Sequence, residues 1–391
     1  MGRCGFQLNK PAFQRGFDGV HGIEVMVAEG FAAHGRRRNL RVGSWRVHYE
    51  TPYYFFALAL TMPQRCVIPP RMFSAQRKLV VAAPAKINLF LEILGRRPDG
   101  YHDLRSVVAP VALADEVTLT LTGDAIALDV QAAPGISLER LGPPEENLAC
   151  RAVRLLQEKF PASVPAGVHI RILKKIPIGG GLGGGSADAA AVLAGLARLC
   201  ELDLNHDELL ALGAVLGSDV PALVLGGFVR SGMVLMEGRG EKVSPLPGIG
   251  VEKPHDGFWV VVANPGFPVP TCDAYRLCHK TQCLTGKPNT FNNTVSSVRS
   301  GNVFGVAAAL FNGLEAGVFT AYPETARLAA RLKDAGGLGV LLSGSGASVF
   351  ALVRDEAHGQ DVRRRLGDGV WSVLTKTLPD GVMVAHGPLE P

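Results

Sequence analysis

Apolar and polar positions alternate along several short segments after residue 78, and this pattern predicts β-strands. Ile87, Leu89, Leu91 and Ile93 form the clearest run, and the turn-forming residues 96–100 follow it. Because successive side chains of a strand point to opposite faces, each run presents one apolar face to a core. Other strands are predicted at residues 117–121, 168–172, 259–263, 339–342, 347–353, 370–376 and 382–386.

Apolar residues at helical spacing predict helices between these strands. Asn147 can cap a helix in which Ala152 and Leu155 share a face. Ser186 is the predicted N-cap of an alanine-rich helix that runs to Leu199. Further helices are predicted near residues 206–216, 304–313, 323–334 and 356–366.

The order of these elements indicates an α+β protein with two domains. The second half follows the order strand–helix–strand–strand–helix–strand, which is typical of a split βαβ sandwich. Glycine, proline and charged residues dominate residues 232–257 and indicate a junction. We therefore expect one domain at residues 79–232 and another at residues 233–391, a division that suits a chain of 391 residues.

Residues 1–78 show no sustained period of two or 3.6, and we expect little packed structure there. They hold 12 Lys and Arg against 4 Asp and Glu, whereas the remaining residues hold 28 against 31. This basic segment is interpreted either as a transit peptide, which would direct the protein to a plastid, or as an upstream start error. In the second case Met62 or Met72 is the true start, and the low serine content makes this at least as good an interpretation.

Charge and cysteine content narrow the functional classes. Because the chain after residue 78 is slightly acidic, its charge gives no support to a nucleic-acid-binding role. Glycine and serine interrupt the uncharged residues 335–353, which therefore predict strands and a turn rather than a membrane helix. Seven cysteines without a secretory signal favour a cytoplasmic protein. Cys272, Cys278, His279 and Cys283 form one cluster, but its spacing is not a usual zinc pattern, and free thiols are the simpler interpretation.

Residues 177–186 are the segment most informative about function. All of Gly179 to Gly185 are glycine except Leu182, so the backbone can adopt positive φ and place its N–H groups against a ligand. Such a run before a helix N-terminus favours phosphate oxygens and predicts a nucleotide site. A dinucleotide fingerprint could use Glu201 as its acidic residue, but so dense a run fits many patterns, and the lysine of a Walker A loop is absent. A flexible linker is the remaining alternative, and the strand before the run and the helix after it argue against that.

Three segments together resemble the GHMP small-molecule kinases: Pro84–Leu89, the glycine run, and Leu342–Ala347. Two more, Gly95–His102 and Gly217–Pro221, narrow the resemblance to the branch that acts on 4-diphosphocytidyl-2-C-methyl-D-erythritol. The resemblance covers roughly residues 79–390, in order and without large gaps, and leaves residues 1–78 without a counterpart.

The resemblance implies a ribosomal-S5-like N-terminal domain that binds ATP and a ferredoxin-like C-terminal domain. It implies that ATP, with Mg²⁺, phosphorylates the 2-hydroxyl of that substrate in the non-mevalonate route to isoprenoid precursors. The expected partner is this small molecule, without nucleic acid or membrane, and a monomer or weak homodimer is expected. Two alternatives stay open: another GHMP kinase, acting on mevalonate, galactose or homoserine, and an inactive nucleotide-binding regulator. A regulator is expected to lose Lys86 or Asp219, and the chain has both.

Lys86 and Asp219 are the catalytic residues that the resemblance implies. The Asp219 carboxylate can take the proton of the alcohol as the P–O bond forms, although capping of the helix that starts at Val220 is the alternative. The Lys86 ammonium can orient the attacking oxygen and offset charge on the phosphoryl group, and a solvated lysine is the alternative. Asn88 lies two residues further on the same strand face and is predicted to support this pair, with a strand-edge role as the alternative.

For ATP, the resemblance implies backbone donors from the glycine run together with the Ser186 hydroxyl. Asn147 and Lys175 are the two predicted contacts outside this run, and helix capping or solvent exposure is the alternative for each. Asp188 either stabilises the helix dipole or acts on Mg²⁺ indirectly, and no protein ligand for the metal is certain. The predicted ATP-binding residues are Pro177, Gly179, Gly180, Gly181, Leu182, Gly183, Gly184, Gly185, Ser186, Asn147 and Lys175.

For the acceptor substrate, the resemblance implies that cytosine lies between the rings of Tyr101 and Tyr275 while His102 hydrogen-bonds the base edge. Residues 101–102 could instead be a buried pair at a turn, and residues 344–346 could be a tight turn between strands. Residues 312–315 depart from the family's Asn-Asp-Leu-Glu at Gly313, and no function is assigned to them. The predicted substrate-binding residues are Asn88, Tyr101, His102, Tyr275, Gly344, Ser345 and Gly346.

Overall fold

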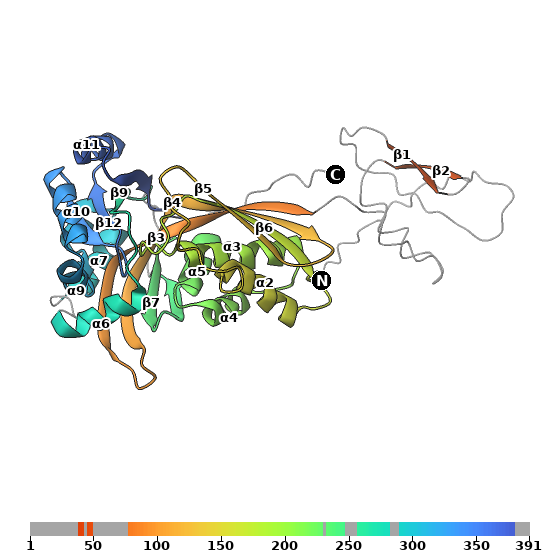
Figure 1. Ribbon diagram of the computed structural model, residues 1–391, viewed down its shortest axis with the longest axis horizontal. Helices are drawn as coiled ribbons and strands as arrows, with labels where there is room; N and C mark the ends of the chain where they lie inside the picture. Colours follow the sequence, from red (N-terminus) through yellow and green to blue (C-terminus); the bar gives the residue numbers. More distant parts are fainter. Residues whose placement is uncertain are drawn as a thin grey trace, which may run out of the picture. The chain divides into compact units, whose positions relative to one another are not determined.

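The computed structural model describes residues 38–42, 45–49, 77–229, 232–246, 256–281 and 289–379. The chain divides into one unit at Met1–Ser74 and another at Ala75–Pro391 (Figure 1). Among the described residues, every helix is too short or too polar to cross a membrane.

The first unit contains an antiparallel hairpin of β1 (Arg38–Val42) and β2 (Trp45–Tyr49). The sequence analysis expected little packed structure across residues 1–78. The pairing of β1 with β2 was not predicted, and the wider expectation stays a prediction. Apolar and polar residues alternate within β2, but over only five positions, and the search for a sustained period missed so short a run.

A seven-stranded sheet forms the first layer of the second unit. Its centre is a long antiparallel hairpin of β3 (Lys78–Arg96) and β4 (His102–Thr122), drawn in orange tones in Figure 1. The sheet order is β10-β3-β4-β6-β5, and β7 pairs with β4 and with β8. The other strands are β5 (Ala127–Ala132), β6 (Gly167–Lys174), β7 (Val234–Gly238), β8 (Lys242–Pro245) and β10 (Phe311–Asn312).

Helices pack against this sheet and close its apolar face. They are α2 (Leu148–Lys159), α3 (Gly184–Leu199), α4 (His206–Leu216) and α5 (Val220–Phe228), and Figure 1 shows them grouped along one side of the strands. Asn147 caps α2 as predicted, because its side chain accepts a hydrogen bond from the Ala149 N–H at 2.9 Å. The core between α3 and the strands includes Leu79, Val81, Leu119, Ile170, Leu193 and Leu196.

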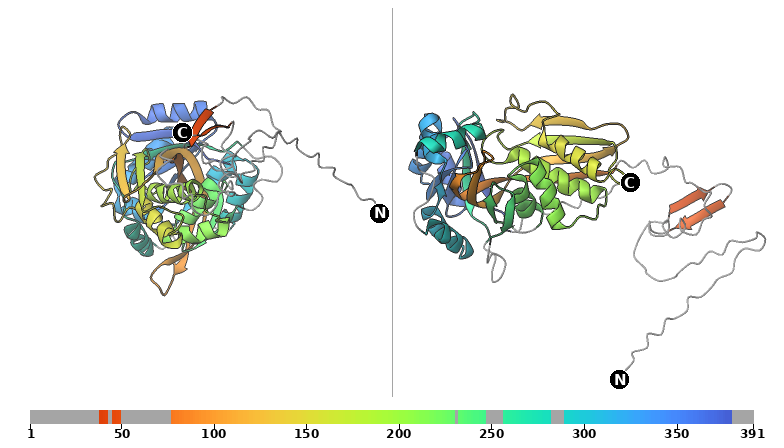
Figure 2. Two further views of the ribbon diagram at one scale, coloured as in Figure 1. Left: turned by 90° about the vertical axis from the view of Figure 1, so that its right-hand side faces the viewer. Right: turned by 90° about the horizontal axis from the view of Figure 1, so that it is seen from below.

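A four-stranded antiparallel sheet forms the second half, in the order β11-β12-β9-β13. Its strands are β9 (Trp259–Asn264), β11 (Gly339–Leu342), β12 (Val349–Val353) and β13 (Trp371–Lys376). With α10 (Pro323–Asp334) and α11 (Glu356–Leu366), they confirm the predicted strand–helix–strand–strand–helix–strand order. The right-hand view of Figure 2 shows these elements, in teal to blue, gathered at one end of the unit.

The structure also corrects the predicted elements of the second half. The helix expected at 304–313 is α8 (Val303–Ala308), and the short strand β10 follows it. Helices α6 (Thr271–Thr281), α7 (Thr290–Arg299) and α9 (Glu315–Ala321) were not predicted. The strand expected at 382–386 lies outside the described residues. Strands β7 and β8 extend the first sheet into the predicted junction, and the domain boundary after residue 232 stays a prediction.

A chain that begins at Met72 is expected to unfold at the same urea concentration as the full chain. It keeps Arg77, whose guanidinium donates to the Leu199 carbonyl at 3.1 Å and whose own carbonyl accepts from the Leu121 N–H at 2.9 Å. A matched chain that begins at Ala82 loses the buried side chains of Leu79 and Val81 and is expected to unfold at lower urea, since a buried leucine contributes about 2–5 kcal/mol. A lower midpoint for the Met72 chain would mean that residues 1–71 stabilise the second unit.

Candidate active site

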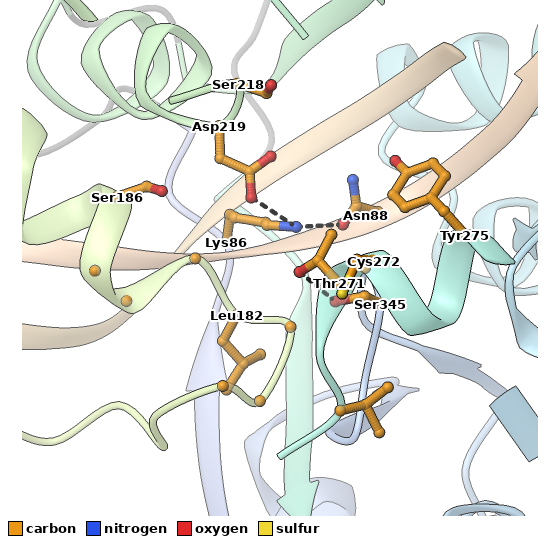
Figure 3. A pocket seen from close by; sticks show the side chains of 18 of the residues that line it. Lys86, Asn88, Leu182, Ser186, Ser218, Asp219, Thr271, Cys272, Tyr275 and Ser345 are labelled. Atoms are coloured by element: carbon orange, nitrogen blue, oxygen red, sulfur yellow. Dashed lines mark hydrogen bonds and ion pairs between the residues drawn. The ribbon is translucent and has the colours of Figure 1, made fainter. Parts of the chain in front are cut away.

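A pocket of ≈ 950 Å³ collects residues from both halves of the second unit. Figure 3 shows the glycine loop, the Lys86 strand and the start of α6 around it. Two predicted site residues, Lys175 and Gly346, are not part of its wall. The predicted residues that line it are Lys86, Asn88, Tyr101, His102, Asn147, Pro177, Gly179, Gly180, Gly181, Leu182, Gly183, Gly184, Gly185, Ser186, Asp219, Tyr275, Gly344 and Ser345.

The Lys86 side chain lies in the wall of this pocket and is 5% exposed. The pairing of β3 with β4 shifts register between Pro84 and Lys86, and the Lys86 N–H donates to the Leu182 carbonyl of the glycine loop at 2.9 Å. Its Nζ donates to Asn88 Oδ1 at 2.8 Å and lies 3.5 Å from Asp219 Oδ2 (Figure 3). The bulge therefore frees the Lys86 backbone to hold the loop while the ammonium stays beside the carboxylate.

Asp219 precedes α5, but its side chain makes no capping hydrogen bond. Its backbone is helical, with φ −83° and ψ −16°, whereas a capping residue normally adopts an extended conformation. The capping alternative is therefore wrong, and the carboxylate instead pairs with Lys86. The Asp219 side chain is 35% exposed, so a bound hydroxyl group can reach it from the pocket.

A short chain of hydrogen bonds holds the Asn88 amide. Its Nδ2 donates to Ser106 Oγ at 2.8 Å, and the Ser106 hydroxyl donates to the Phe90 carbonyl at 2.6 Å. This arrangement turns Asn88 Oδ1 toward Lys86. Sequence reasoning missed Ser106, although an isolated serine in the apolar part of β4 is the signal that could have identified it.

The glycine loop needs its glycines for two separate reasons. Gly179, Gly181 and Gly183 have φ of 68°, 74° and 72°, a region that side-chain-bearing residues rarely adopt. A Cβ at Gly181 would stand 2.1 Å from the Ser343 carbonyl oxygen, so the loop can touch the turn after β11 only without side chains. The Ser343 hydroxyl donates to the Gly181 carbonyl at 3.2 Å and strengthens this contact.

The helix after the loop begins earlier than predicted. Its N-cap is Gly183 in the left-handed conformation, and no side chain caps it, so the prediction that Ser186 is the cap is wrong. Ser186 instead lies in the first turn, where Gly184, Gly185 and Ser186 all line the pocket. A helix terminus without a side-chain cap leaves its N–H groups available to an anion in the pocket.

A buried ionic triad lies behind the glycine loop. Lys174 Nζ donates to Asp188 Oδ2 at 2.8 Å and also to Asp115, and all three side chains are at most 5% exposed. Burial raises the pKa of Asp188 to about 7, with Lys174 opposing and Asp115 adding to the shift. The two carboxylates outweigh burial at Lys174 and raise its pKa. Asp188 therefore holds the Lys174 side chain by a hydrogen bond rather than only stabilising the helix dipole.

Lys174, and not Lys175, belongs to the pocket wall. Lys175 Nζ lies 3.8 Å from Glu116 Oε2, and its side chain is 41% exposed, as the solvent-exposure alternative proposed. Lys175 follows the last residue of β6 and lies near Glu116, whereas Lys174 is buried against Asp115 and Asp188, so the two side chains do not share one site. The prediction therefore named the neighbour of the lysine that lines the pocket.

The two rings that stack in the structure are not the two that were predicted to enclose cytosine, Tyr101 and Tyr275. His102 stacks on Tyr275 with ring centroids 5.0 Å apart and an interplanar angle of 27°, whereas Tyr101 is 53% exposed. A base between two rings needs roughly 7 Å, two carbon contacts of about 3.5 Å, so no base fits between these two. Tyr101 and His102 are adjacent in an extended segment and diverge for that reason. Burial, and then the nearby Asp219 carboxylate, raise the pKa of Tyr275 above its ordinary value.

Residues 312–315, to which the sequence analysis assigned no function, hold the turn at residues 343–346 in place by hydrogen bonds. The Asn312 amide donates to the carbonyls of Leu342 and Gly344 at 2.9 and 2.8 Å. Glu315 accepts a hydrogen bond from the Leu342 N–H at 2.8 Å. At the pocket side, the Ser345 and Thr271 hydroxyls lie 3.2 Å apart (Figure 3). Asn312 and Glu315 therefore position Gly344 and Ser345, and the match to a family motif was the available signal.

The cysteine cluster gives no support to a metal site. Cys272 is exposed in the pocket wall and Cys278 is buried in α6, whereas Cys283 and the side chain of His279 lie outside the described residues. Across the described part of the chain, no group of three or more His, Cys, Asp and Glu could hold a metal ion.

Comparison with known proteins matches this geometry to a family. The models for the N-terminal and C-terminal domains of GHMP kinases match residues 147–227 and 296–370. A 4-diphosphocytidyl-2-C-methyl-D-erythritol kinase of Bacillus cereus strain B4264 is 40% identical over 289 residues, which cover 72% of this chain and 90% of the relative. The chain belongs to the GHMP kinases, in the family of the 4-diphosphocytidyl-2-C-methyl-D-erythritol kinases.

Further relatives agree with this assignment. A kinase of the same name from Gloeobacter violaceus is 40% identical over 311 residues, which are 77% of this chain and 95% of the relative. A crystal structure of 4-(cytidine 5'-diphospho)-2C-methyl-D-erythritol kinase, 31% identical, superposes with a TM-score of 0.61 over 76% of this chain and 99% of its own. Homoserine kinase from Cytophaga hutchinsonii, at 20% identity and a TM-score of 0.57 over 79% of this chain and 97% of its own, shares the fold. The expected two-domain α+β GHMP fold is confirmed.

Gly185→Val is expected to weaken ATP binding about tenfold or more while leaving the urea midpoint nearly unchanged. A Cβ at Gly185 meets nothing within 4 Å, so the new side chain projects into the pocket and displaces a phosphate from the helix terminus. Gly181→Val is the matched contrast, since its φ of +74° and the Ser343 contact predict a loss of stability. Calorimetric ATP titration and urea unfolding separate the two effects, and unchanged ATP affinity in a folded Gly185→Val protein would contradict the phosphate site.

Asp188→Asn is expected to change how stability depends on pH. Between about pH 4 and pH 7 the folded wild type keeps a proton on Asp188 that the unfolded chain has lost. Its free energy of unfolding therefore falls as pH rises in this window, by up to about 1.4 kcal/mol per pH unit, and levels off above pH 7. Because the amide of the variant does not titrate, the stability of the variant relative to wild type should rise from pH 5 to pH 7. Urea unfolding at pH 5 to 8 measures this difference, and a constant value would refute it.

Proposed function

We propose that this protein uses ATP to phosphorylate the 2-hydroxyl of 4-diphosphocytidyl-2-C-methyl-D-erythritol. The observation that carries the proposal is the Lys86–Asp219 pair, at 3.5 Å, in one pocket with the glycine loop. Relatives named for this kinase, at 40% identity over 90% and 95% of their length, support the choice of substrate. The mevalonate and homoserine kinase structures resemble the chain at only 16–20% identity, which favours those substrates less.

Asp219 is proposed as the general base. Its carboxylate accepts the proton of the 2-hydroxyl while that oxygen forms a bond to the γ-phosphorus and the bond to the ADP oxygen breaks. Lys86, held by Asn88 at 2.8 Å, orients the attacking oxygen and offsets negative charge on the transferring group. Lys86 is nearly fully buried, so its charge acts where little water screens it.

The triphosphate is proposed to lie along residues 179–186, with N–H groups at the start of α3 as donors and Asn147 and Lys174 nearby. Magnesium commonly binds through phosphates, waters and one or two protein oxygens. The residues at this site can supply such oxygens. Ser186 offers a hydroxyl, and Asp188 has a buried oxygen, Oδ1, without a hydrogen-bond partner. Bound there, the metal would neutralise phosphate charge.

The acceptor substrate is proposed to occupy the end lined by Tyr101, His102 and Tyr275, with Gly344 and Ser345 close to the reacting group. Because His102 already stacks on Tyr275, we propose that cytosine contacts the outer side of this pair or displaces His102. A cytoplasmic location and a monomeric or weakly dimeric state stay predictions of the sequence.

Asp219→Asn is expected to lower kcat by about 10²–10⁴ while leaving ATP affinity near the wild-type value. The amide keeps the shape of the side chain and loses the proton acceptor. The assay combines protein, ATP and Mg²⁺ with the cytidine-diphospho substrate, and parallel reactions replace that substrate with mevalonate or homoserine. Asp207→Asn, at an exposed position in α4, is the matched control and should retain full activity. Wild-type turnover by Asp219→Asn would refute the base, and faster use of mevalonate or homoserine would refute the substrate.

A further inference from the structure

Arginines gather at the end of the pocket proposed for the acceptor substrate. They come from three different elements: Arg96 from the end of β3, Arg239 from the turn between β7 and β8, and Arg276 from α6. The acceptor carries a diphosphate that must be neutralised in the pocket, an argument that rests on the proposed function. The glycine loop is committed to the phosphates of ATP, so a second set of donors is required.

Arg239 stands on the most constrained backbone of the three. Its neighbours Gly238 and Gly240 have φ of 70° and 119°, both in the region that favours glycine. A Cβ at Gly240 would lie 2.7 Å from the carbonyl oxygen of Ser218, the residue before Asp219. The turn that carries Arg239 is therefore packed directly against the segment that carries the proposed base.

The Arg239 guanidinium lies over the Tyr101 ring, with its central carbon 5.2 Å from the ring centroid. Its Nε is 4.0 Å from Glu241 Oε2, which is beyond hydrogen-bond distance. This contact depends on the charge of the guanidinium and not on its N–H groups, which can still donate to a planar or tetrahedral anion. The side chain is 41% exposed, so a ligand in the pocket can reach these donors.

The other two arginines are weaker candidates. Arg276 already donates to Asp273 at 2.8 Å, and its side chain is 73% exposed, so both competition and water reduce its value to a ligand. Arg96 ends a strand beside the hairpin turn and has no constraint comparable to the Gly240–Ser218 contact. Of these three, Arg239 alone combines a constrained backbone, a contact with an aromatic ring and a side chain open to the pocket.

We propose that Arg239 is a specificity residue that binds the diphosphate of the acceptor nucleotide while its charge contacts the face of the Tyr101 ring. One side chain would then bind the diphosphate and also contact Tyr101, which lines the proposed site for the base. Because its turn touches Ser218, Arg239 also sets the distance between the bound diphosphate and Asp219. A purely structural role, in which Arg239 only supports Tyr101, is the competing explanation.

Calorimetric binding of CDP and of cytidine separates these explanations, because only CDP carries the diphosphate. In the wild type we expect CDP to bind more tightly than cytidine. Arg239→Gln should weaken CDP by about 10- to 100-fold, the loss expected for charge-assisted hydrogen bonds, and should change cytidine by less than about threefold. Arg239→Lys keeps the charge but loses the planar guanidinium, so its CDP affinity should lie between those of the wild type and Arg239→Gln.

Arg327→Gln is the matched control, since Arg327 is an exposed arginine of α10 paired with Glu324. It should leave both affinities unchanged, and ATP affinity and the urea midpoint should stay at wild-type values in all variants. Equal weakening of CDP and cytidine in Arg239→Gln would establish the structural role and overturn the proposal, as would unchanged CDP affinity. If the wild type phosphorylates the proposed substrate and Arg239→Gln keeps its CDP affinity, this inference is overturned and the proposed function is not. A wild type that does not bind CDP overturns the proposed function as well.

Discussion

The site depends on one close backbone contact, between the glycine loop and the turn that follows β11. Gly181 and Ser343 approach so closely that a Cβ at Gly181 would lie 2.1 Å from a carbonyl oxygen, and a Cβ at Gly344 would lie 2.9 Å from Lys86 Nζ. The loop belongs to the first half of the fold and the turn to the second. Because this contact joins them, a nucleotide on the loop and an acceptor beside the turn can share one pocket. Preorganisation of this kind is the main way in which an enzyme lowers a barrier to phosphoryl transfer.

Residues with a local backbone signal were the easiest to predict from the sequence. The glycine run, the Asn147 cap and the strand that carries Lys86 are all in place, and Lys86 meets Asp219 as the family motif implied. Where the prediction was wrong, contacts distant in sequence decided the outcome. Asp115 lies far along the chain from Lys174, and it is this carboxylate that draws Lys174 inward while Lys175 faces Glu116.

Two other differences have the same origin. The cytosine clamp was inferred from two tyrosines, but the direction of each ring depends on strand alternation, which places His102 against Tyr275. Strands β7 and β8 lie in a segment rich in glycine and charge, and they form because β4 offers an edge to pair with. A sequence pattern of this kind cannot reveal an edge that a distant strand supplies, so Arg239 escaped prediction with them.

The two ends of the pocket offer different kinds of hydrogen-bond donor, which suits the two anionic ligands of the proposed reaction, ATP and the acceptor diphosphate. On the proposed ATP side, backbone N–H groups are the proposed phosphate donors, and the Lys174 side chain is held by Asp115 and Asp188. On the proposed acceptor side, arginine side chains are the proposed donors, and Lys86 and Asp219 line the same pocket. Backbone donors cannot rotate away, so they suit a triphosphate whose reacting phosphorus must stay in place. Side-chain donors adapt to a longer ligand, and the contact between the Arg239 guanidinium and the Tyr101 ring limits that freedom. The proposed sites for the two substrates therefore differ in stiffness, with backbone donors for the nucleotide and side-chain donors for the acceptor.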